Sequence, residues 1–378
     1  MRRRALLWAG GLAAATATAH ADELGEPVEA SVAIHGFVSQ GFLYTSDNNY
    51  LADTEDGSFE FAEAGVNVTR QLGDELRVGM QLFARDLGPL GNYSAKLDWF
   101  YLDYRWRDWL GLRAGRLKLP FGLYNDSVDV DAVHPVALLP QSVYPARNRD
   151  FLLAQTGVEL YGYHDLGALG ALDYRAYGGT IFLDPGESSN PAVRLVALDI
   201  PYVIGARVLW EPPVEGLRIG ASAQAARLES ELLAPAPVSF DIDALFWVAS
   251  VEYSADRLFV AGEYSRWHLD TTSSDQMLAP DRSTTSERAY VLAAFRVRPW
   301  LQPGGYYAVY FPDVAQREGK EGHQHDVAAT LRFDITPHWL VKLEGHYLRG
   351  TADVAASLNP TGESNRWQML VAKTTAYF

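Results

Sequence analysis

Hydrophobic and polar residues alternate strictly along residues 74–86, DELRVGMQLFARD. Every second residue is apolar from Leu76 to Ala84, and the residues between them are charged, polar or glycine, apart from Phe83. A period of two predicts a β-strand with one apolar and one polar face. The alternation recurs further along the chain, at 217–224, 291–298, 326–334 and 339–347.

Extended segments of this kind follow one another, and no long amphipathic helix interrupts them. We predict about sixteen strands at 31–44, 58–70, 74–86, 94–105, 109–118, 153–164, 169–182, 200–210, 215–229, 239–254, 257–269, 285–298, 301–311, 323–335, 338–349 and 365–378. Each is near the length that a tilted strand needs to cross a bilayer. No stretch beyond the first twenty residues approaches the length of a transmembrane helix.

The connections between these strands fall into two classes that alternate along the chain. Seven are very short, at 71–73, 107–108, 166–167, 212–213, 255–256, 299–300 and 336–337. The others are longer and polar, at 45–57, 87–93, 119–152, 183–199, 230–238, 270–284, 312–322 and 350–364. A soluble sandwich or propeller has no reason to sort its loops by parity. The pattern predicts an all-β fold, a transmembrane antiparallel β-barrel of about 16 strands with short periplasmic turns and long extracellular loops.

The alternation alone does not separate this barrel from a soluble β-fold, whose polar face also meets water. Aromatic residues make up 12% of the chain, including 10 tryptophans and 20 tyrosines. Six of them flank the short turns: Trp106, Trp109, Trp210, Tyr253, Trp300 and Trp339. Tryptophan and tyrosine favour the headgroup level of a membrane, so this position favours the membrane barrel over tryptophans that cap a soluble barrel.

The N-terminus has the pattern of a secretory signal peptide. Arg2–Arg4 form a basic region, an apolar stretch follows, and Ala19-His20-Ala21 matches a cleavage site. We therefore predict a leader at 1–21, cleaved after Ala21, and one barrel domain at 22–378. Loss of three arginines takes the formal charge from −15 to about −18. An acidic exported chain has no bulk attraction for nucleic acid, and a chain without cysteine cannot use disulfides.

Two segments and the C-terminus resemble a known family. The segments are IHGFVSQGF at 34–42 and GRLKLPFGLYN at 115–125, and a terminal Phe378 resembles the assembly signal of outer-membrane barrels, although Ala376 stands where a second aromatic is usual. Both segments look like Gram-negative outer-membrane porins, and the second is similar to the phosphate-selective porin O and P family and its relatives. The resemblance implies about sixteen strands, usually homotrimers, and a loop folded into the lumen. The chain has no lysine cluster, so phosphate specificity is not carried over.

The longest connection, 119–152, is the candidate for that loop. It contains four prolines and an apolar patch at 136–139, so we expect it to pack against something. Its ionisable residues are Asp126, Asp129, Asp131, His134, Arg147, Arg149 and Asp150. Acids on one side of a narrow lumen and arginines on the other would set a transverse field and a size limit for polar solutes. The alternative is a loop that lies over the mouth of the barrel.

Strand parity predicts which charged residues line the lumen. We single out seven basic residues and one acid: Arg77, Arg85, Arg113, Arg218, Arg296, Arg332, Lys342 and Glu344. Glu63, Asp98, Glu263 and Asp326 point the same way. Basic residues slightly outnumber acids on this face, which favours anions.

The sequence offers little for catalysis or metal binding. No Gly-x-Ser-x-Gly motif is present. His323, His325 and Asp326 could suggest a metal or acid–base pair, but alternation separates His325 from Asp326. The acidic loop around Asp47 and Asp53 matches no EF-hand spacing. We predict no cofactor, no metal and no enzymatic activity.

Together these patterns predict a passive diffusion channel for small hydrophilic solutes in the Gram-negative outer membrane, in contact with lipid and lipopolysaccharide. An outer-membrane barrel enzyme of lipase or protease type, a structural barrel with a plugged lumen and a soluble periplasmic β-protein remain as alternatives.

Overall fold

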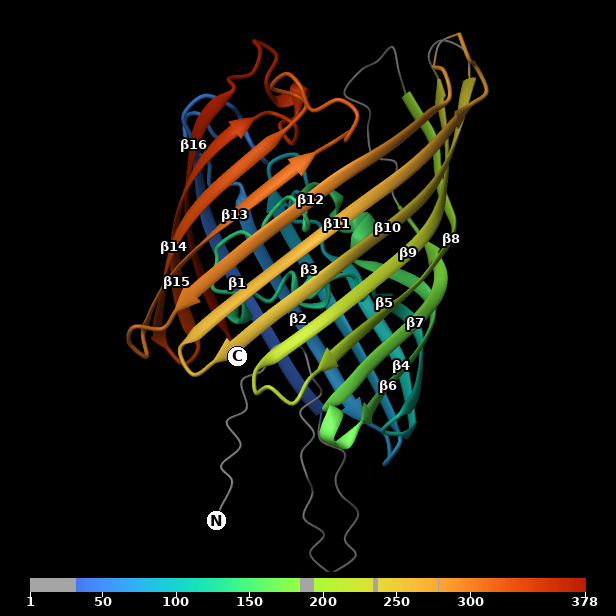
Figure 1. The fold of residues 1–378 in the computed structure, drawn as a ribbon, viewed down its shortest axis with the longest axis vertical. Helices are drawn as coiled ribbons and strands as arrows, with labels where there is room; N and C mark the ends of the chain where they lie inside the picture. Colours follow the sequence, from blue (N-terminus) through green and yellow to red (C-terminus); the bar gives the residue numbers. More distant parts are fainter. Residues whose placement is uncertain (1–31, 184–193, 234–236, 278) are drawn as a thin grey trace, which may run out of the picture.

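The computed structural model describes residues 32–183, 194–233, 237–277 and 279–378, and the predicted leader 1–21 lies outside them. Within these ranges sixteen antiparallel strands form one closed barrel, in which β1 (Val32–Thr45) pairs with both β2 and β16 (Figure 1). The other strands are β2 (Phe61–Gln71), β3 (Leu76–Leu87), β4 (Lys96–Arg107), β5 (Leu110–Lys118), β6 (Ala154–Asp165), β7 (Ala171–Ile181), β8 (Arg194–Glu211), β9 (Leu217–Leu233), β10 (Pro237–Ala255), β11 (Leu258–Ser273), β12 (Arg282–Phe295), β13 (Leu301–Phe311), β14 (Gln324–Thr336), β15 (Trp339–Gly350) and β16 (Arg366–Tyr377). The prediction of a barrel of about sixteen strands is confirmed.

The outer face of the barrel is apolar, which reverses the arrangement of a soluble sheet. In β3, Met80 and Leu82 point outward and are 42% and 49% exposed, whereas Gln81 and Phe83 between and beside them are buried. Outward apolar residues recur around the wall, for example Val158, Ile204, Val291, Leu343 and Leu370. A closed sheet with no free edge and an apolar outer band is suited to hydrocarbon, where every backbone group must be paired internally.

One end of the barrel carries the short turns and the other carries the long connections. The six aromatic residues that flank the short turns are all exposed on the outer face. Their position is that of an interfacial aromatic belt. No helix among the described residues is long and apolar enough to cross a membrane.

Several strands extend further than the sequence predicts, so three predicted long connections, 183–199, 230–238 and 270–284, were wrong in extent. β8 begins at Arg194, β9 reaches Leu233 and β10 begins at Pro237, and these strands rise above the rest of the wall (Figure 1). Charged residues near this end pair across strands on the outer face: Arg227 of β9 lies 3.2 Å from Asp241 of β10. Cross-strand ion pairs let a polar segment stay in the sheet.

The end of β12 also differs from the prediction. The sequence predicts a strand through residue 298, whereas β12 ends at Phe295, and Arg296 lies in the following turn. Its guanidinium still reaches an acid of the wall, Asp334, at 2.5 Å.

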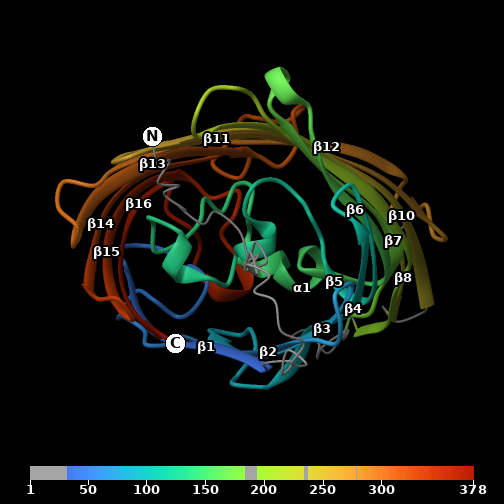
Figure 2. The same cartoon turned by 90° about the horizontal axis from the view of Figure 1, so that it is seen from below.

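The connection between β5 and β6 lies inside the barrel, as the view along the barrel shows (Figure 2). It contains short helical turns at Asn125–Ser127, Asp131–Val133 and Ala146–Asn148, and the single-turn helix α1 (Arg149–Leu152). We call residues 119–153 the inner loop. The inner loop positions all of the candidate site.

Candidate functional site

Apolar side chains fix the inner loop to the wall on several sides. Val136, Leu139 and Val143 pack with Leu292 and Tyr306 of the wall in one buried cluster. Three further clusters contain Leu119, Phe121 and Leu138 of the loop. Burial of this apolar surface makes the loop a packed element of the barrel interior and not a flexible plug.

A buried glutamate of β11 holds one side of the loop. Glu263 accepts hydrogen bonds from the backbone N–H of Leu123 at 2.9 Å, the hydroxyl of Ser250 at 2.5 Å, the hydroxyl of Tyr290 at 2.8 Å and the hydroxyl of Tyr144. Two of these four donors belong to the inner loop. The carboxylate therefore satisfies loop groups that water would otherwise have to solvate.

A second glutamate, on β15, holds the opposite side. Glu344 accepts hydrogen bonds from the backbone N–H groups of Ala137 at 2.9 Å and Leu138 at 3.2 Å. His346 lies 3.1 Å from Glu344 and 3.0 Å from Asp326, so its ring bridges two carboxylates. The predicted lumen residue Glu344 is thus covered by the loop and contacts it directly.

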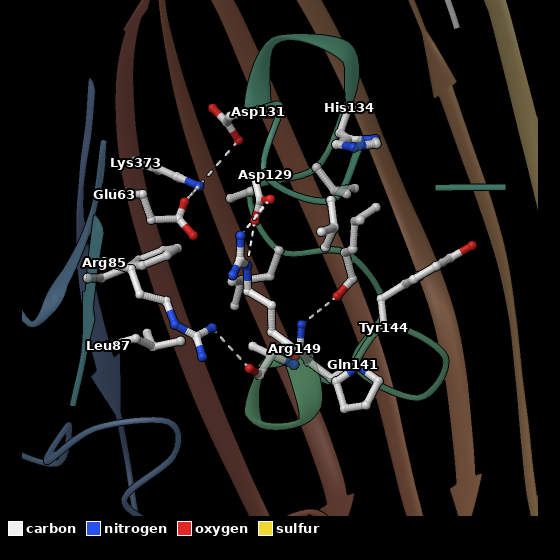
Figure 3. Close-up of a pocket in the computed structure, with 18 of the residues that line it drawn as sticks. Glu63, Arg85, Leu87, Asp129, Asp131, His134, Gln141, Tyr144, Arg149 and Lys373 are labelled. Atoms are coloured by element: carbon white, nitrogen blue, oxygen red, sulfur yellow. Dashed lines mark hydrogen bonds and ion pairs between the residues drawn. The ribbon is translucent and has the colours of Figure 1, made fainter. Parts of the chain in front are cut away.

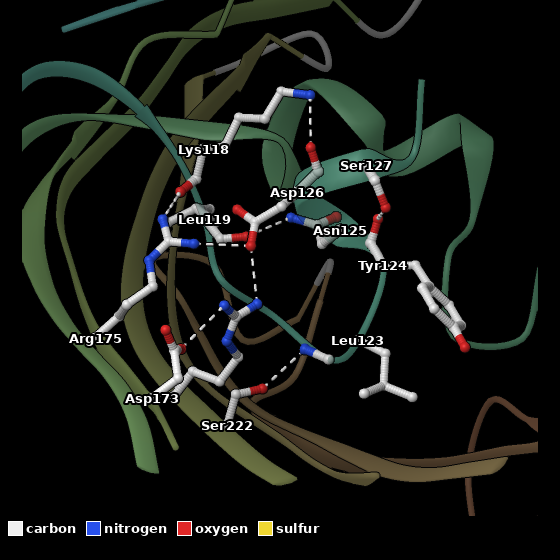
Figure 4. Close-up of polar contacts among 12 residues, drawn as sticks. Lys118, Leu119, Leu123, Tyr124, Asn125, Asp126, Ser127, Asp173, Arg175 and Ser222 are labelled. Carbon is white, nitrogen blue, oxygen red and sulfur yellow. Dashed lines mark hydrogen bonds and ion pairs between the residues drawn. The ribbon is translucent and has the colours of Figure 1, made fainter. Parts of the chain in front are cut away.

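Three aspartates of the loop each lie between two basic residues. Asp126 Oδ2 is 2.8 Å from Arg175 and 2.8 Å from Arg207 (Figure 4). These arginines are directly opposite each other in neighbouring strands β7 and β8. Burial would raise the pKa of the Asp126 carboxyl, but the two guanidinium groups outweigh it and hold that pKa below its usual range.

Asp129 is paired within the loop and with the wall. Arg149 of α1 binds Asp129 through two hydrogen bonds at 2.7 and 2.8 Å and reaches Asp98 of β4 at 3.0 Å, while Lys118 lies 3.4 Å from Asp129. Burial opposes ionisation of Asp129, but the charges of Arg149 and Lys118 hold its pKa well below the usual range. The expected separation of loop acids from loop arginines is therefore not seen, because Arg149 neutralises loop and wall acids together.

Asp131 lies between two lysines that are also directly opposite each other in neighbouring strands. Its carboxylate is 2.7 Å from Lys342 of β15 and 3.5 Å from Lys373 of β16, and it accepts a hydrogen bond from Thr375 at 2.7 Å. Lys373 also binds Glu63 at 2.8 Å. Burial would raise the pKa of Asp131, but the lysine charges hold it well below its usual range.

A pocket lies between the inner loop and the wall formed by β2, β3 and β16, with a volume of about 70 Å³ (Figure 3). Polar groups enter it from Glu63, Arg85 and Lys373 of the wall and from Arg149 and Tyr144 of the loop. Apolar residues of the loop line much of the rest. The pocket is narrow, with room for only a few waters.

His134 lies at the edge of this pocket and is buried. Its Nε2 is 2.8 Å from the carbonyl oxygen of Ser127. Burial lowers the pKa of the imidazole to about 4, so the ring is neutral at ordinary pH and donates to that carbonyl.

The other two predicted loop residues lie near the long-loop end. Asp150 is half exposed and lies 3.5 Å from Arg85 and 3.3 Å from Lys96. Arg147 donates a hydrogen bond to the carbonyl oxygen of Asp353, in the connection between β15 and β16. Arg147 therefore ties the loop to a second connection.

The predicted wall residues form ion pairs on the inner face. Arg77 and Arg113 flank Asp103 at 2.7 and 3.3 Å, and Arg113 reaches Glu159 at 2.9 Å. Arg218 binds an acid of β10 at 2.6 Å.

Arg332 is held from both sides. Its guanidinium donates to the carbonyl oxygens of Ala132 and His134 in the loop and lies 2.8 Å from Asp334. Lys342 is completely buried under the loop.

Several site residues were missed in the sequence. Arg175, Arg207 and Lys373 carry the charges that face the loop aspartates, and Glu159 lies between Arg113 and Arg175. Strand parity could have found Arg175, since it alternates with apolar residues in β7. Parity does not reveal that Arg175 and Arg207 are opposite each other, because register depends on the whole sheet.

The described residues contain no group of three or more His, Cys, Asp or Glu side chains placed to hold a metal ion. The ring centroids of His323 and His325 lie 5.3 Å apart with the rings tilted by 58°, and no acid among the described residues completes a site with them.

Solved structures of outer-membrane proteins share this fold. The outer-membrane-expressed OmpT of Vibrio cholerae matches 94% of this chain and 100% of its own, with a TM-score of 0.62 and 12% identity. An anion-selective porin of Comamonas acidovorans matches 93% of this chain and 100% of its own, with a TM-score of 0.60 and 14% identity. OmpF of Salmonella typhi matches 92% of this chain and 98% of its own, with a TM-score of 0.59 and 13% identity.

The fold is therefore that of the sixteen-stranded outer-membrane β-barrels, the class to which porins belong. No protein-family model and no curated protein matches the sequence.

Proposed function

We propose that this protein is an outer-membrane porin, a passive diffusion channel for small hydrophilic solutes. The observation that carries the proposal is the inverted barrel: apolar side chains cover the outside, and charged side chains together with a loop occupy the inside. Charged groups on the inner face require water, and a water-filled lumen across a bilayer is a route for polar solutes. The fold shared with solved porins supports this function.

The inner loop narrows the channel in this proposal. The predicted constriction residues of the loop meet the wall from several sides, so they limit the size of solutes and set the local charge. The basic residues of the wall favour anions weakly, because most of them are paired with carboxylates. The chemistry is exclusion by size and charge, with no reaction.

Export and assembly complete the proposal. The leader 1–21 directs the chain out of the cytoplasm and is removed after Ala21. The apolar outer band contacts lipid, and the charged outer residues at the long-loop end lie where lipopolysaccharide begins. Homotrimers are expected for a barrel of this class, and one of the solved neighbours is described as a trimer form.

A structural barrel with a plugged lumen is the second candidate. The close packing of the inner loop against the wall favours it. Purified protein in planar bilayers separates the two: stepwise conductance supports the porin, whereas a heat-modifiable, folded barrel without conductance supports the plug. Hydrolysis of lipid or peptide by the same preparation would support the barrel enzyme instead.

A further inference from the structure

Two pairs of like charges face each other across neighbouring strands of the inner wall. Arg175 and Arg207 are directly opposite in β7 and β8, and Lys342 and Lys373 are directly opposite in β15 and β16. Like charges in this position repel each other and destabilise a sheet. Each pair is bridged by one aspartate, and both aspartates belong to the inner loop and not to the wall.

We propose that Asp126 sets the ion selectivity of the channel by neutralising the Arg175–Arg207 pair. This inference rests on the proposed function. Without the loop, Arg175 and Arg207 would keep only the wall acids Glu159 and Asp173, each of which contacts one of the two arginines, so the wall by itself would attract anions more strongly. The loop supplies the carboxylate that cancels this preference, and one side chain thus determines how strongly the lumen selects anions.

Solvent exposure makes Asp126 better suited to this role than Asp131. Its side chain is 22% exposed, and those of Arg175 and Arg207 are 12% and 9% exposed, so water in the lumen reaches the cluster. By contrast Lys342 is completely buried beneath the loop, and its pair with Asp131 is 0% and 4% exposed. A change of charge at Asp126 therefore acts on passing ions, whereas a change at Asp131 acts on stability.

The neighbours of Asp126 hold this part of the loop independently of its carboxylate. Asn125 donates to the carbonyl oxygens of Leu119 and Leu152 at 2.8 and 2.7 Å, and Lys118 donates to the backbone carbonyl of Asp126 at 2.9 Å. An asparagine at 126 keeps these bonds and the size of the side chain while removing the charge. The loop is therefore expected to stay in place in D126N.

Glu159 is the wall acid nearest the pair. It lies 2.6 Å from Arg175, but it is shared with Arg113 at 2.9 Å. Asp173 lies 3.6 Å from Arg207 and is 38% exposed. Neither acid contacts both Arg175 and Arg207 as Asp126 does, so their presence reduces the effect of D126N without replacing Asp126.

The test is the reversal potential of single channels under a salt gradient. D126N is expected to raise the anion-to-cation permeability ratio roughly threefold, with the largest shift at low salt, because the Debye length falls from about 10 Å at 0.1 M to about 3 Å at 1 M. R207Q in the D126N background should return the ratio toward that of the wild type. D243N removes a carboxylate from the outer face near Arg227 and should leave the ratio unchanged.

The outcomes separate this inference from the proposed function. A wild-type channel that conducts, with the same reversal potential in D126N, overturns the role of Asp126 and leaves the porin intact. A wild-type barrel that does not conduct overturns the porin.

If the wild-type barrel does not conduct, the salt dependence of thermal stability still tests whether Asp126 neutralises the two arginines. Bare Arg175 and Arg207 repel each other less when salt screens them, so D126N should gain more thermal stability from added salt than D243N does. Equal salt dependence of the two variants would show that Asp126 neutralises nothing.

Discussion

Lys342 and Lys373 are directly opposite each other in β15 and β16, and Asp131 of the inner loop bridges them at 2.7 and 3.5 Å. A carboxylate between two ammonium groups in this position offsets their mutual repulsion, and Glu63 of β2 gives Lys373 a second partner at 2.8 Å. The strands therefore depend on the loop as much as the loop depends on the strands. The wall and the inner loop form one electrostatic unit.

Removal of the Asp131 charge should destabilise the barrel strongly. In D131N the buried Lys342 loses the carboxylate at 2.7 Å, whereas Lys373 keeps Glu63, and removal of one partner of a buried ion pair costs about 3–5 kcal/mol. The midpoint of urea unfolding in detergent micelles, followed by heat-modifiable migration on a gel, measures the loss.

The matched control for D131N is D150N in the same loop. Asp150 is 48% exposed and its ion pairs are at the surface, so the expected change is below about 1 kcal/mol. Equal midpoints for the two variants would mean that the Asp131–Lys342 pair contributes nothing to stability.

Loss of the Glu263 carboxylate should free one side of the inner loop. E263A removes the acceptor of the buried Tyr144 hydroxyl and one of the two acceptors of the Leu123 N–H, which keeps only the Tyr144 oxygen at 3.0 Å. We expect trypsin to cleave the folded variant within the loop, after Arg147 or Arg149, at least about tenfold faster than the wild type. Fragments are identified by mass spectrometry.

Glu287 of β12 provides the comparison, since it lies on the outer face and contacts no residue of the loop. E287A should leave the rate of cleavage in the loop unchanged. An intact loop in E263A would argue that apolar packing alone holds it.

Stability should fall as the pH decreases from about 6.5 to about 4, because of His134. In the unfolded chain the imidazole takes up a proton near its ordinary pKa of 6.5, whereas in the folded barrel its pKa is about 4. The unfolded state therefore binds more protons in this window, and the folded state loses up to about 3 kcal/mol across it. Thermal unfolding at a series of pH values measures this slope.

H134N should flatten the pH dependence between those two values. The loop aspartates do not interfere, because their pKa values lie below the ordinary carboxyl value and their contribution is lost only at lower pH. The same slope in H134N and wild type would assign the pH dependence to other groups.

The free-energy cost of an arginine on the outer face should depend on its depth in the bilayer. Val291 is 62% exposed in the middle of the apolar band on β12, and V291R is expected to cost about 2–4 kcal/mol in a bilayer. Ile335 lies at the short-turn end of β14, where I335R should cost about 0–1 kcal/mol. Folding yield into lipid vesicles measures both, and equal yields would contradict a lipid-facing band.

The sequence alone determined the strands, their faces and the location of the inner loop in the chain. The alternation between Leu76 and Ala84 suffices for β3, because the side chains of a strand change face at every residue. It failed at the long-loop ends of some strands: residues 194–199 and 230–233 read as loop, yet they belong to β8 and β9.

Only the tertiary structure decided which charges meet. The register of β7 with β8 and of β15 with β16 places Arg175 opposite Arg207 and Lys342 opposite Lys373, and no local pattern contains that register. The fold of the inner loop then brings Asp126 and Asp131 to those pairs. Local periodicity fixes the direction of a side chain, but its partner depends on segments far away in the chain, whose packing is a property of the closed barrel.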